Sequence, residues 1–190
     1  MEPFQRLIVE EIFAQGRVEA LVTVPKGQGK TCLMAALAVY HLIVTTNANA
    51  FVGASTKIQA DEMFRFIAHY IESEPQIAAR LLLRRSTREV RSMQGQGFLR
   101  VLASDDSKQG GKSQGYNPTL ALIDELHAHE SSTLYTDLRS GLFKNHGILV
   151  TITTAGWDQE SVLGQLRQGF LEADQNGGTV ERGLIVKGAE

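Results

Sequence analysis

Short apolar runs rich in β-branched residues alternate along the chain with longer stretches in which apolar positions recur every three or four residues. The first pattern is typical of buried strands, and the second of helices that pack one face against a sheet. In chain order, the predicted helices cover residues 3–14, 30–44, 57–72, 131–143 and 159–173. The predicted strands cover residues 18–24, 50–56, 120–123, 148–153 and 180–186, with a hairpin over 89–102 that turns near 94–97. Strands that alternate with helices favour a mostly parallel sheet covered by helices on both faces.

Composition adds limits to this α/β prediction without changing it. The 190 residues suit one domain, and 43% hydrophobic and 21% charged residues are ordinary for a globular protein. Cys32 is the single cysteine, so an internal disulfide is excluded, which fits a reducing cytosol. No apolar run approaches the roughly 20 residues of a membrane span, and no signal peptide is recognised, so no membrane association is expected. Because the net charge is −2, any contact with DNA is expected to be local or supplied by another domain or subunit.

A glycine-containing loop separates the first predicted strand from the alanine- and leucine-rich helix that follows it. The loop reads Pro25-Lys26-Gly27-Gln28-Gly29-Lys30-Thr31. A strand, a glycine loop and a helix in this order present backbone N–H groups and the positive end of a helix to a phosphate. Lys30 is then expected to reach the β- and γ-phosphates, and the Thr31 hydroxyl to hold Mg²⁺. The pattern is imperfect, because Val24 stands where the standard phosphate loop has its first glycine.

The chain contains a second copy of the short core of this motif, Gly111-Lys112-Ser113. This copy follows a polar run and precedes Gln114-Gly115-Tyr116-Asn117-Pro118, so neither a predicted strand nor a predicted helix flanks it. It therefore lacks the geometry that cradles a phosphate. The predicted strand and helix on either side, and not the three-residue motif alone, identify residues 29–31 as the expected phosphate-binding copy.

A second candidate feature is an apolar strand that ends in two acids, Asp124 and Glu125. A phosphate-loop ATPase needs one carboxylate at the metal and a second that polarises the attacking water. Asp124 is therefore the expected metal residue, and Glu125 the expected catalytic one. Such a pair argues against a small-molecule kinase, which needs no hydrolytic base beside the metal-binding aspartate. The alternative is that the two acids have no catalytic role and only mark the place where the strand meets solvent.

With these residues placed, the sequence from Pro3 to about Trp157 resembles the N-terminal ATPase domain of the large terminase subunit of tailed bacteriophages. Members of that family typically lack the first glycine of the phosphate loop and carry a basic residue three positions before its last glycine, as Val24 and Lys26 do here. The remaining similar segments, in chain order, are Pro3-Phe4-Gln5, residues 54–60, Gly115-Tyr116-Asn117-Pro118 before the acidic strand, and Thr153-Thr154-Ala155-Gly156.

The resemblance implies a fold, a cofactor set and site roles. The fold would be an ASCE-type P-loop NTPase, a three-layer αβα sandwich around a mostly parallel sheet. Gln5 would recognise adenine, Lys26 would join Lys30 at the γ-phosphate, and Thr153 and Thr154 would couple the phosphate state to DNA-gripping elements. The residues expected to contact ATP are Gln5, Pro25, Lys26, Gly27, Gln28, Gly29, Lys30, Thr31 and Cys32, with Mg²⁺ at Thr31 and Asp124.

The resemblance also implies the biological setting. The chain would be a single ATPase domain over residues 1–190 that moves double-stranded DNA into a procapsid in the cytoplasm of an infected or prophage-bearing bacterium. Its partners would be the portal protein, the small terminase subunit and further copies of itself in a ring. The family's nuclease domain is absent from this chain, so no nuclease activity is expected. The alternatives are a helicase-like remodeller of nucleic acid and a non-catalytic nucleotide-binding assembly module.

Several residues keep two interpretations at this stage. Gln5 could cap the first helix, Lys26 could be a surface lysine, and Cys32 and Trp157 could serve packing. Five arginines between Arg80 and Arg91 could form a solvated face, a subunit interface or a DNA track. His127 and His129 suggest local structural roles more than a zinc site, because no further ligand spacing accompanies them. Candidates for a cation donated to the neighbouring subunit's site are Lys108, Lys112 and Arg139.

Overall fold

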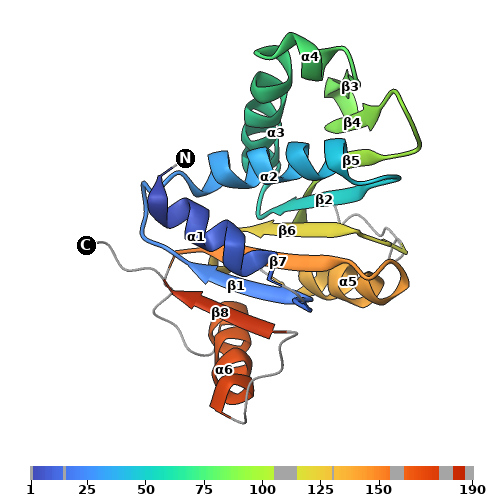
Figure 1. The fold of residues 1–190 in the computed structure, drawn as a ribbon. Coiled ribbons are helices and arrows are strands. Elements are labelled where there is room, and N and C mark those ends of the chain that lie inside the picture. Colours follow the sequence, from blue (N-terminus) through green and yellow to red (C-terminus); the bar gives the residue numbers. More distant parts are fainter. Residues whose placement is uncertain are drawn as a thin grey trace.

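A single eight-stranded sheet organises the computed structural model, which describes residues 2–14, 16–104, 115–129, 131–154, 161–175 and 182–186. Within these ranges the strand order is β3-β4-β5-β2-β6-β7-β1-β8 (Figure 1). The strands are β1 (Glu19–Thr23), β2 (Asn49–Ala54), β3 (Leu81–Arg84), β4 (Glu89–Ser92), β5 (Phe98–Ala103), β6 (Leu120–Asp124), β7 (Ile148–Thr153) and β8 (Arg182–Val186). The pairings from β5 to β8 along this order are all parallel, whereas β4 runs antiparallel to both β3 and β5.

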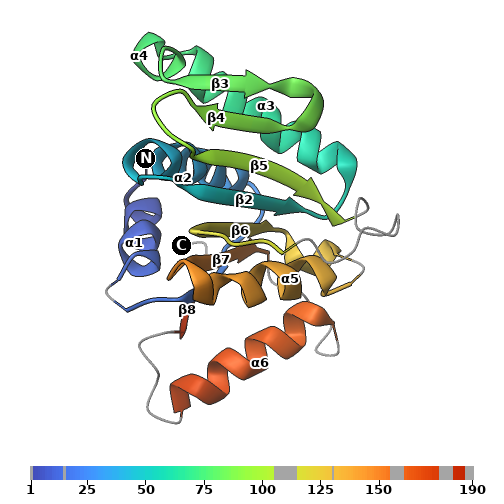
Figure 2. The same cartoon turned by 90° about the vertical axis from the view of Figure 1, so that its right-hand side faces the viewer.

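Helices cover both faces of the sheet. They are α1 (Pro3–Ile12), α2 (Lys30–Val44), α3 (Lys57–Glu72), α4 (Pro75–Ala78), α5 (Thr133–Gly141) and α6 (Val162–Gln175). Figure 2 shows α1, α2 and α3 on one side of the strands and α5 and α6 on the other. Each side has its own apolar cluster, with Ile12, Met34 and Met63 in one and Leu138 and Phe170 in the other. The predicted three-layer αβα fold with a mostly parallel sheet is therefore confirmed.

The central strands read as continuous apolar runs because both of their faces are covered. Every residue of β6 and of β7 is buried. Buried strands of this kind are typical of parallel sheets between two helical layers. The predicted strand over 50–56 ends earlier, at Ala54, because the Thr56 side chain accepts a hydrogen bond from the backbone N–H of Gln59 and so caps α3. Among the described residues, no helix combines the length and the apolar character that crossing a bilayer requires.

Two short elements between α3 and β4 do not follow from the sequence pattern. These are α4 and β3, which extends the predicted hairpin to a third antiparallel strand at the sheet edge. Of the β3 side chains only Leu81 is buried, so the strand lacks the apolar alternation that would have predicted it. Its pairing to β4, with Leu83 opposite Val90, therefore depends on the neighbouring strand more than on local preference.

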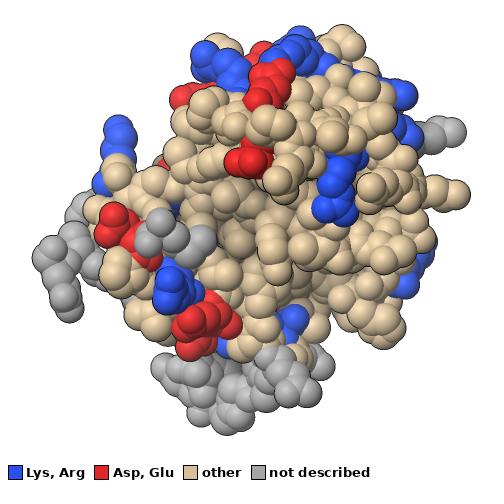
Figure 3. Space-filling view, turned by 45° about the horizontal axis from the view of Figure 1, so that its top comes forward, with Lys and Arg blue, Asp and Glu red and all other residues tan. Residues whose placement is uncertain are grey.

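The arginines of this region largely have acidic partners. Arg91 and Arg100 both bind the buried carboxylate of Glu89, at 2.6 Å and 2.5 Å, and Arg84 lies 3.8 Å from it. Burial alone raises the pKa of Glu89, but the hydrogen bonds from Arg100 and Arg91 outweigh it and leave the pKa lowered. Figure 3 shows basic side chains interspersed with acidic ones at the end of the molecule that carries α3 and α4. These contacts give Arg84 and Arg91 an intramolecular role that differs from the solvated face, subunit interface and DNA track considered from the sequence.

His41 supplies a first prediction, on stability against pH. Its Nε2 lies 2.8 Å from Thr119 Oγ1 and so joins α2 to the segment that enters β6. Burial lowers the His41 pKa from 6.5 to about 4. Between pH 6.5 and pH 4, His41 is therefore protonated in the unfolded chain but neutral in the folded one. The free energy of unfolding should therefore fall as pH drops from about 6.5 to 4, by on the order of 2–3 kcal/mol from this group alone. Urea denaturation of wild type and His41→Gln across this range measures it, and equal pH slopes in the two proteins would contradict the assignment.

Candidate nucleotide-binding and hydrolysis site

The loop between β1 and α2 lies where the carboxyl ends of β1, β6 and β7 meet. Gly27 and Gly29 have φ angles of 84° and 70°, in the left-handed region that glycine adopts without steric cost. Gly29 is the N-cap of α2, so the unpaired N–H groups and the positive dipole end of a 15-residue helix face this loop. Val24, the departure from the standard motif, is buried and donates its N–H to Thr153 O at 3.1 Å. The Val24 side chain is thus part of the core, and the chain leaves the sheet to form the loop only after this residue.

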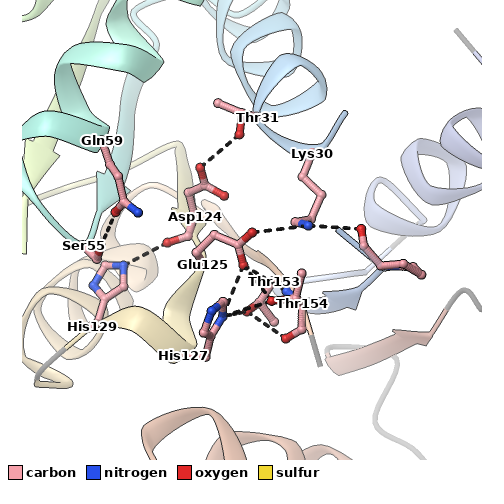
Figure 4. Close-up of polar contacts among 11 residues, drawn as sticks. Lys30, Thr31, Ser55, Gln59, Asp124, Glu125, His127, His129, Thr153 and Thr154 are labelled. Carbon is pink, nitrogen blue, oxygen red and sulfur yellow. Dashed lines mark hydrogen bonds and ion pairs between the residues drawn. The ribbon is translucent and has the colours of Figure 1, made fainter. Parts of the chain in front are cut away.

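Lys30 connects this loop to the acidic strand end. Its side chain is 7% exposed, and its Nζ lies 3.3 Å from Glu125 Oε1 (Figure 4). The same ammonium group donates to Pro25 O at 3.2 Å. A buried lysine is stable only with such partners, since an unpaired buried charge is costly. The convergence of Lys30 with the two acids, expected from the sequence, is therefore observed.

Asp124 ends β6 directly opposite the first turn of α2. Thr31 Oγ1 donates to Asp124 Oδ2 at 3.5 Å, whereas the buried Oδ1 has no hydrogen-bond partner among the described residues. Burial, followed by repulsion from Glu125, raises the Asp124 pKa to about 6, although Lys30 and Thr31 act in the opposite direction. A hydroxyl and a carboxylate with a free oxygen are hard oxygen donors of the kind that Mg²⁺ prefers. The residues present therefore fit the predicted metal.

Glu125 follows in a strained conformation that turns its side chain back toward the loop. Its φ of 48° is uncommon for a residue with a Cβ, and its N–H is fixed by Ile152 O at 3.0 Å. While Oε1 faces Lys30, Oε2 accepts hydrogen bonds from the Thr154 N–H at 3.0 Å and from Thr154 Oγ1 at 3.2 Å. The β7 end predicted as a coupling element thus binds the predicted catalytic carboxylate directly.

Comparison with known proteins identifies the family. A sequence model described as "Terminase large subunit, ATPase domain" matches residues 3–172. The chain belongs to this family. A search of curated proteins finds no match.

Solved structures agree with the terminase assignment in fold. The HK97 bacteriophage large terminase superposes with a TM-score of 0.83 at 17% identity, covering 98% of this chain and 39% of its own. The Thermus phage P74-26 large terminase ATPase domain gives a TM-score of 0.75 at 15% identity, covering 100% of this chain and 81% of its own. The large terminase of a thermophilic bacteriophage in complex with ADP gives 0.68 at 9% identity, covering 99% of this chain and 45% of its own. This terminase ATPase domain therefore spans about two-fifths of the HK97 protein.

Gln5 lies beside the phosphate loop and also caps its own helix. Its Nε2 donates to Gln28 O at 3.3 Å, while its Oε1 accepts from the Glu2 N–H at 3.0 Å. The same amide nitrogen would be 3.3 Å from a Cβ placed on Gly29, which leaves little room for any larger residue there. The capping interpretation is thus observed, and the position of Gln5 also suits the adenine contact that remains predicted.

Of the other predicted site residues, some lie at the phosphate loop, one lies away from it, and the rest fall outside the described residues. Lys26 is exposed in the loop, and half-buried Cys32 lies against Tyr70 of α3, whose pKa is raised by burial and then by the Cys32 contact. Arg139 binds the buried carboxylate of Glu19 at 3.3 Å, at the amino end of β1 and away from this domain's own phosphate loop. It also lines a cavity of about 570 Å³ there. Four of the sequence features lie outside the described residues: Lys108, Lys112, Ala155-Gly156 and Trp157.

Two histidines hold the acidic strand end, which the sequence did not specify. Buried His129 contacts Asp124 O at 2.9 Å and Ser104 Oγ at 2.7 Å, and so joins the ends of β5 and β6; burial lowers its pKa. His127 Nδ1 lies 3.2 Å from Glu125 Oε2 and 2.9 Å from Thr153 Oγ1. Within the described ranges no three His, Cys, Asp or Glu side chains group as metal ligands. Nothing in the sequence indicated these contacts, except that His127 and His129 stand within a few positions of the two acids.

Proposed function

We propose that this domain hydrolyses Mg²⁺-bound ATP and, within an assembled motor, uses the energy to drive double-stranded DNA into a procapsid. One observation carries the proposal. Lys30 and Thr31 at the start of α2 face Asp124 and Glu125 at the end of β6, although Thr31 and Asp124 are 93 positions apart in sequence. Membership of the terminase family supports the ATPase part in general, and the packaging role follows from what that family does.

Nucleotide binding would use the loop and Lys30 first. The backbone N–H groups at the start of α2 would receive the phosphates, as helix N-termini do for anions. Lys30 would then exchange its Glu125 partner, now at 3.3 Å, for the β- and γ-phosphates. Lys26 would approach from the exposed side, and Gln5 would contact adenine. The ADP complex of the similarly folded large terminase from a thermophilic bacteriophage supports a nucleotide in this fold.

The metal would be held by Thr31 Oγ1 and Asp124, whose buried Oδ1 has no hydrogen-bond partner among the described residues and so could serve as a ligand. When bound, Mg²⁺ supplies charge neutralisation on the phosphate oxygens. Asp124 would then be ionised, because a nearby cation favours the charged form of a carboxylate.

Hydrolysis would fall to Glu125. Departure of Lys30 would release Oε1, which could then accept a proton from the attacking water, while Thr154 still holds Oε2. After Glu125 passes this proton to the inorganic phosphate and the phosphate leaves, Lys30 would return to the carboxylate. Thr153 and Thr154 would thereby relay the phosphate state into β7.

The remaining roles belong to the assembly. A cation from a neighbouring copy would neutralise charge that develops on the phosphoryl group, with Lys108, Lys112 and Arg139 as the candidates. The expected partners are double-stranded DNA, the portal protein, the small terminase subunit and further copies in a ring, in the cytoplasm of an infected bacterium. Arg139 would first have to leave Glu19.

The experiment that tests this function measures ATP hydrolysis per subunit against protein concentration, with and without duplex DNA. We expect the rate per subunit to rise with concentration and with DNA, because the trans cation arrives only on assembly. ATP binding without turnover at every concentration would instead favour a nucleotide-binding assembly module. Stimulation by DNA fits both a packaging motor and a helicase-like remodeller, so the assay is repeated with portal protein added. A rate that the portal leaves unchanged would favour the remodeller.

A further inference from the structure

The side chain of His127 stands in the 3₁₀ turn Leu126–Ala128, directly after the predicted catalytic glutamate. It is about one-third exposed, at 36%, and its Nδ1 faces the network formed by Glu125, Thr153 and Thr154 (Figure 4). The neighbouring Leu126 is fully buried and anchors the turn in the core. A partly exposed ring aimed at a catalytic carboxylate is not explained by packing.

The atoms around His127 Nδ1 indicate which nitrogen of the imidazole ring carries the proton. The Thr153 hydroxyl donates its single hydrogen to Thr154 O at 3.2 Å, and the Thr154 hydroxyl donates to Glu125 Oε2 at 3.2 Å. With their hydrogens placed in this way, both threonine oxygens can accept from His127 Nδ1, at 2.9 Å and 3.4 Å. The carboxylate oxygen, 3.2 Å from Nδ1, is also an acceptor. The ionised carboxylate can only accept, so its contact with Nδ1 favours a hydrogen on that nitrogen, and the two hydroxyls are compatible with it.

We propose that His127 is a positioning residue for ATP hydrolysis, whose Nδ1–H fixes the Oε2 side of Glu125 against the end of β7 so that Oε1 is left to face the water. This inference rests on the proposed function of Glu125. The imidazole would act through Glu125, its contact at 3.2 Å, and not directly on the phosphate or the metal. It restricts the rotation of the carboxylate once Lys30 has moved away, together with the Thr154 N–H and hydroxyl. It also connects Glu125 to Thr153, so the carboxylate and the β7 end move as one unit.

Three substitutions separate the hydrogen bond from the bulk of the ring. His127→Asn keeps a donor close to the position of Nδ1, His127→Gln moves its donor toward the position of Nε2, and His127→Leu removes it. A hydrogen bond to a charged group is worth about 1.5–3 kcal/mol, so His127→Leu and His127→Gln should lower kcat about 10- to 100-fold with KM within about 3-fold. His127→Asn should recover most of kcat. His69→Leu, at an exposed position on α3, is the matched control.

The tautomer provides a readout that needs no turnover. Long-range ¹H–¹⁵N spectra of the nucleotide-free domain should show His127 protonated at Nδ1, and this pattern should weaken in Thr153→Val. An Nε2–H tautomer, or equal kcat values for wild type and His127→Leu, would overturn the proposal. Glu125→Gln measured in parallel keeps the two hypotheses apart. If that variant is inactive while His127→Leu is normal, only the positioning role fails, whereas full activity of Glu125→Gln removes the proposed function of Glu125 itself.

Discussion

Replacing Glu125 by glutamine is expected to lower ATP turnover by about 10²- to 10⁴-fold while ATP binding is retained, because a glutamine cannot accept the proton of the attacking water. The substitution keeps the length of the side chain and its contact with the Thr154 N–H through Oε1 of the new amide. It also removes the ion pair of 3.3 Å that occupies Lys30, so nucleotide affinity should stay equal or increase. Phosphate release measures turnover, and a fluorescent ATP analogue measures binding.

The control for this variant is Glu62→Gln, at an exposed position on α3. It changes net charge by the same amount and should leave both turnover and affinity unchanged. Loss of ATP binding in Glu125→Gln would mean that the carboxylate supports the loop structurally. Retained turnover would exclude Glu125 as the base and would require another group to activate the water.

Replacing Asp124 by asparagine is expected to change activity and stability in opposite directions. Turnover should fall at least about 100-fold, because a neutral amide is a weak ligand for Mg²⁺. At pH 8 and without nucleotide, the free energy of unfolding of Asp124→Asn should be higher than that of wild type. The buried carboxyl has a pKa of about 6 against 3.8 in the unfolded chain, so the folded state holds the proton more tightly. Wild-type stability therefore falls as pH rises through this window, and stays lower above it.

The expected gain for Asp124→Asn at pH 8 is on the order of 1–3 kcal/mol, reduced by the loss of attraction to Lys30. At pH 4 most of the difference should disappear, since wild-type Asp124 is then largely neutral. Urea denaturation at the two pH values measures this, with Glu62→Gln on the surface of α3 as the control. Mg²⁺ with ATP should raise the melting temperature of wild type more than that of the variant. A variant less stable than wild type at pH 8 would show that the hydrogen bond from Thr31 outweighs the cost of burying the charge.

Much of the fold was predictable because its information is local. The apolar periods of α2 and α3 and the buried runs of β6 and β7 follow from which faces are covered. The phosphate loop was identified by the strand and helix around it, which the second copy at residues 111–113 lacks in the pattern. The edge strand β3 was missed because its pairing with β4, and not its own side chains, stabilises it.

The arginines between Arg80 and Arg91 illustrate the opposite case. Their density in sequence left open a solvated face, an interface or a DNA track, and nothing local distinguishes these roles. Folding brings Arg100 from β5 onto the buried carboxylate of Glu89 in β4, which Arg91, two positions further along β4, also binds. Burial of that carboxylate without partners would be costly, so the surrounding guanidinium groups are required by its environment.

The sequence by itself determined the order of the longer helices and of the strands other than β3, the glycine loop before α2 and the two acids at the end of β6. Each of these features depends on neighbours a few positions away. Tertiary structure decided which atoms meet. Lys30 pairs with one oxygen of Glu125 while Thr154 and His127 hold the other, and Arg139 turns to Glu19 at the far end of the sheet. Except for His127, which stands two positions after Glu125, these contacts join segments distant in the chain. Their geometry is set by strand order and side-chain packing, which no local pattern contains.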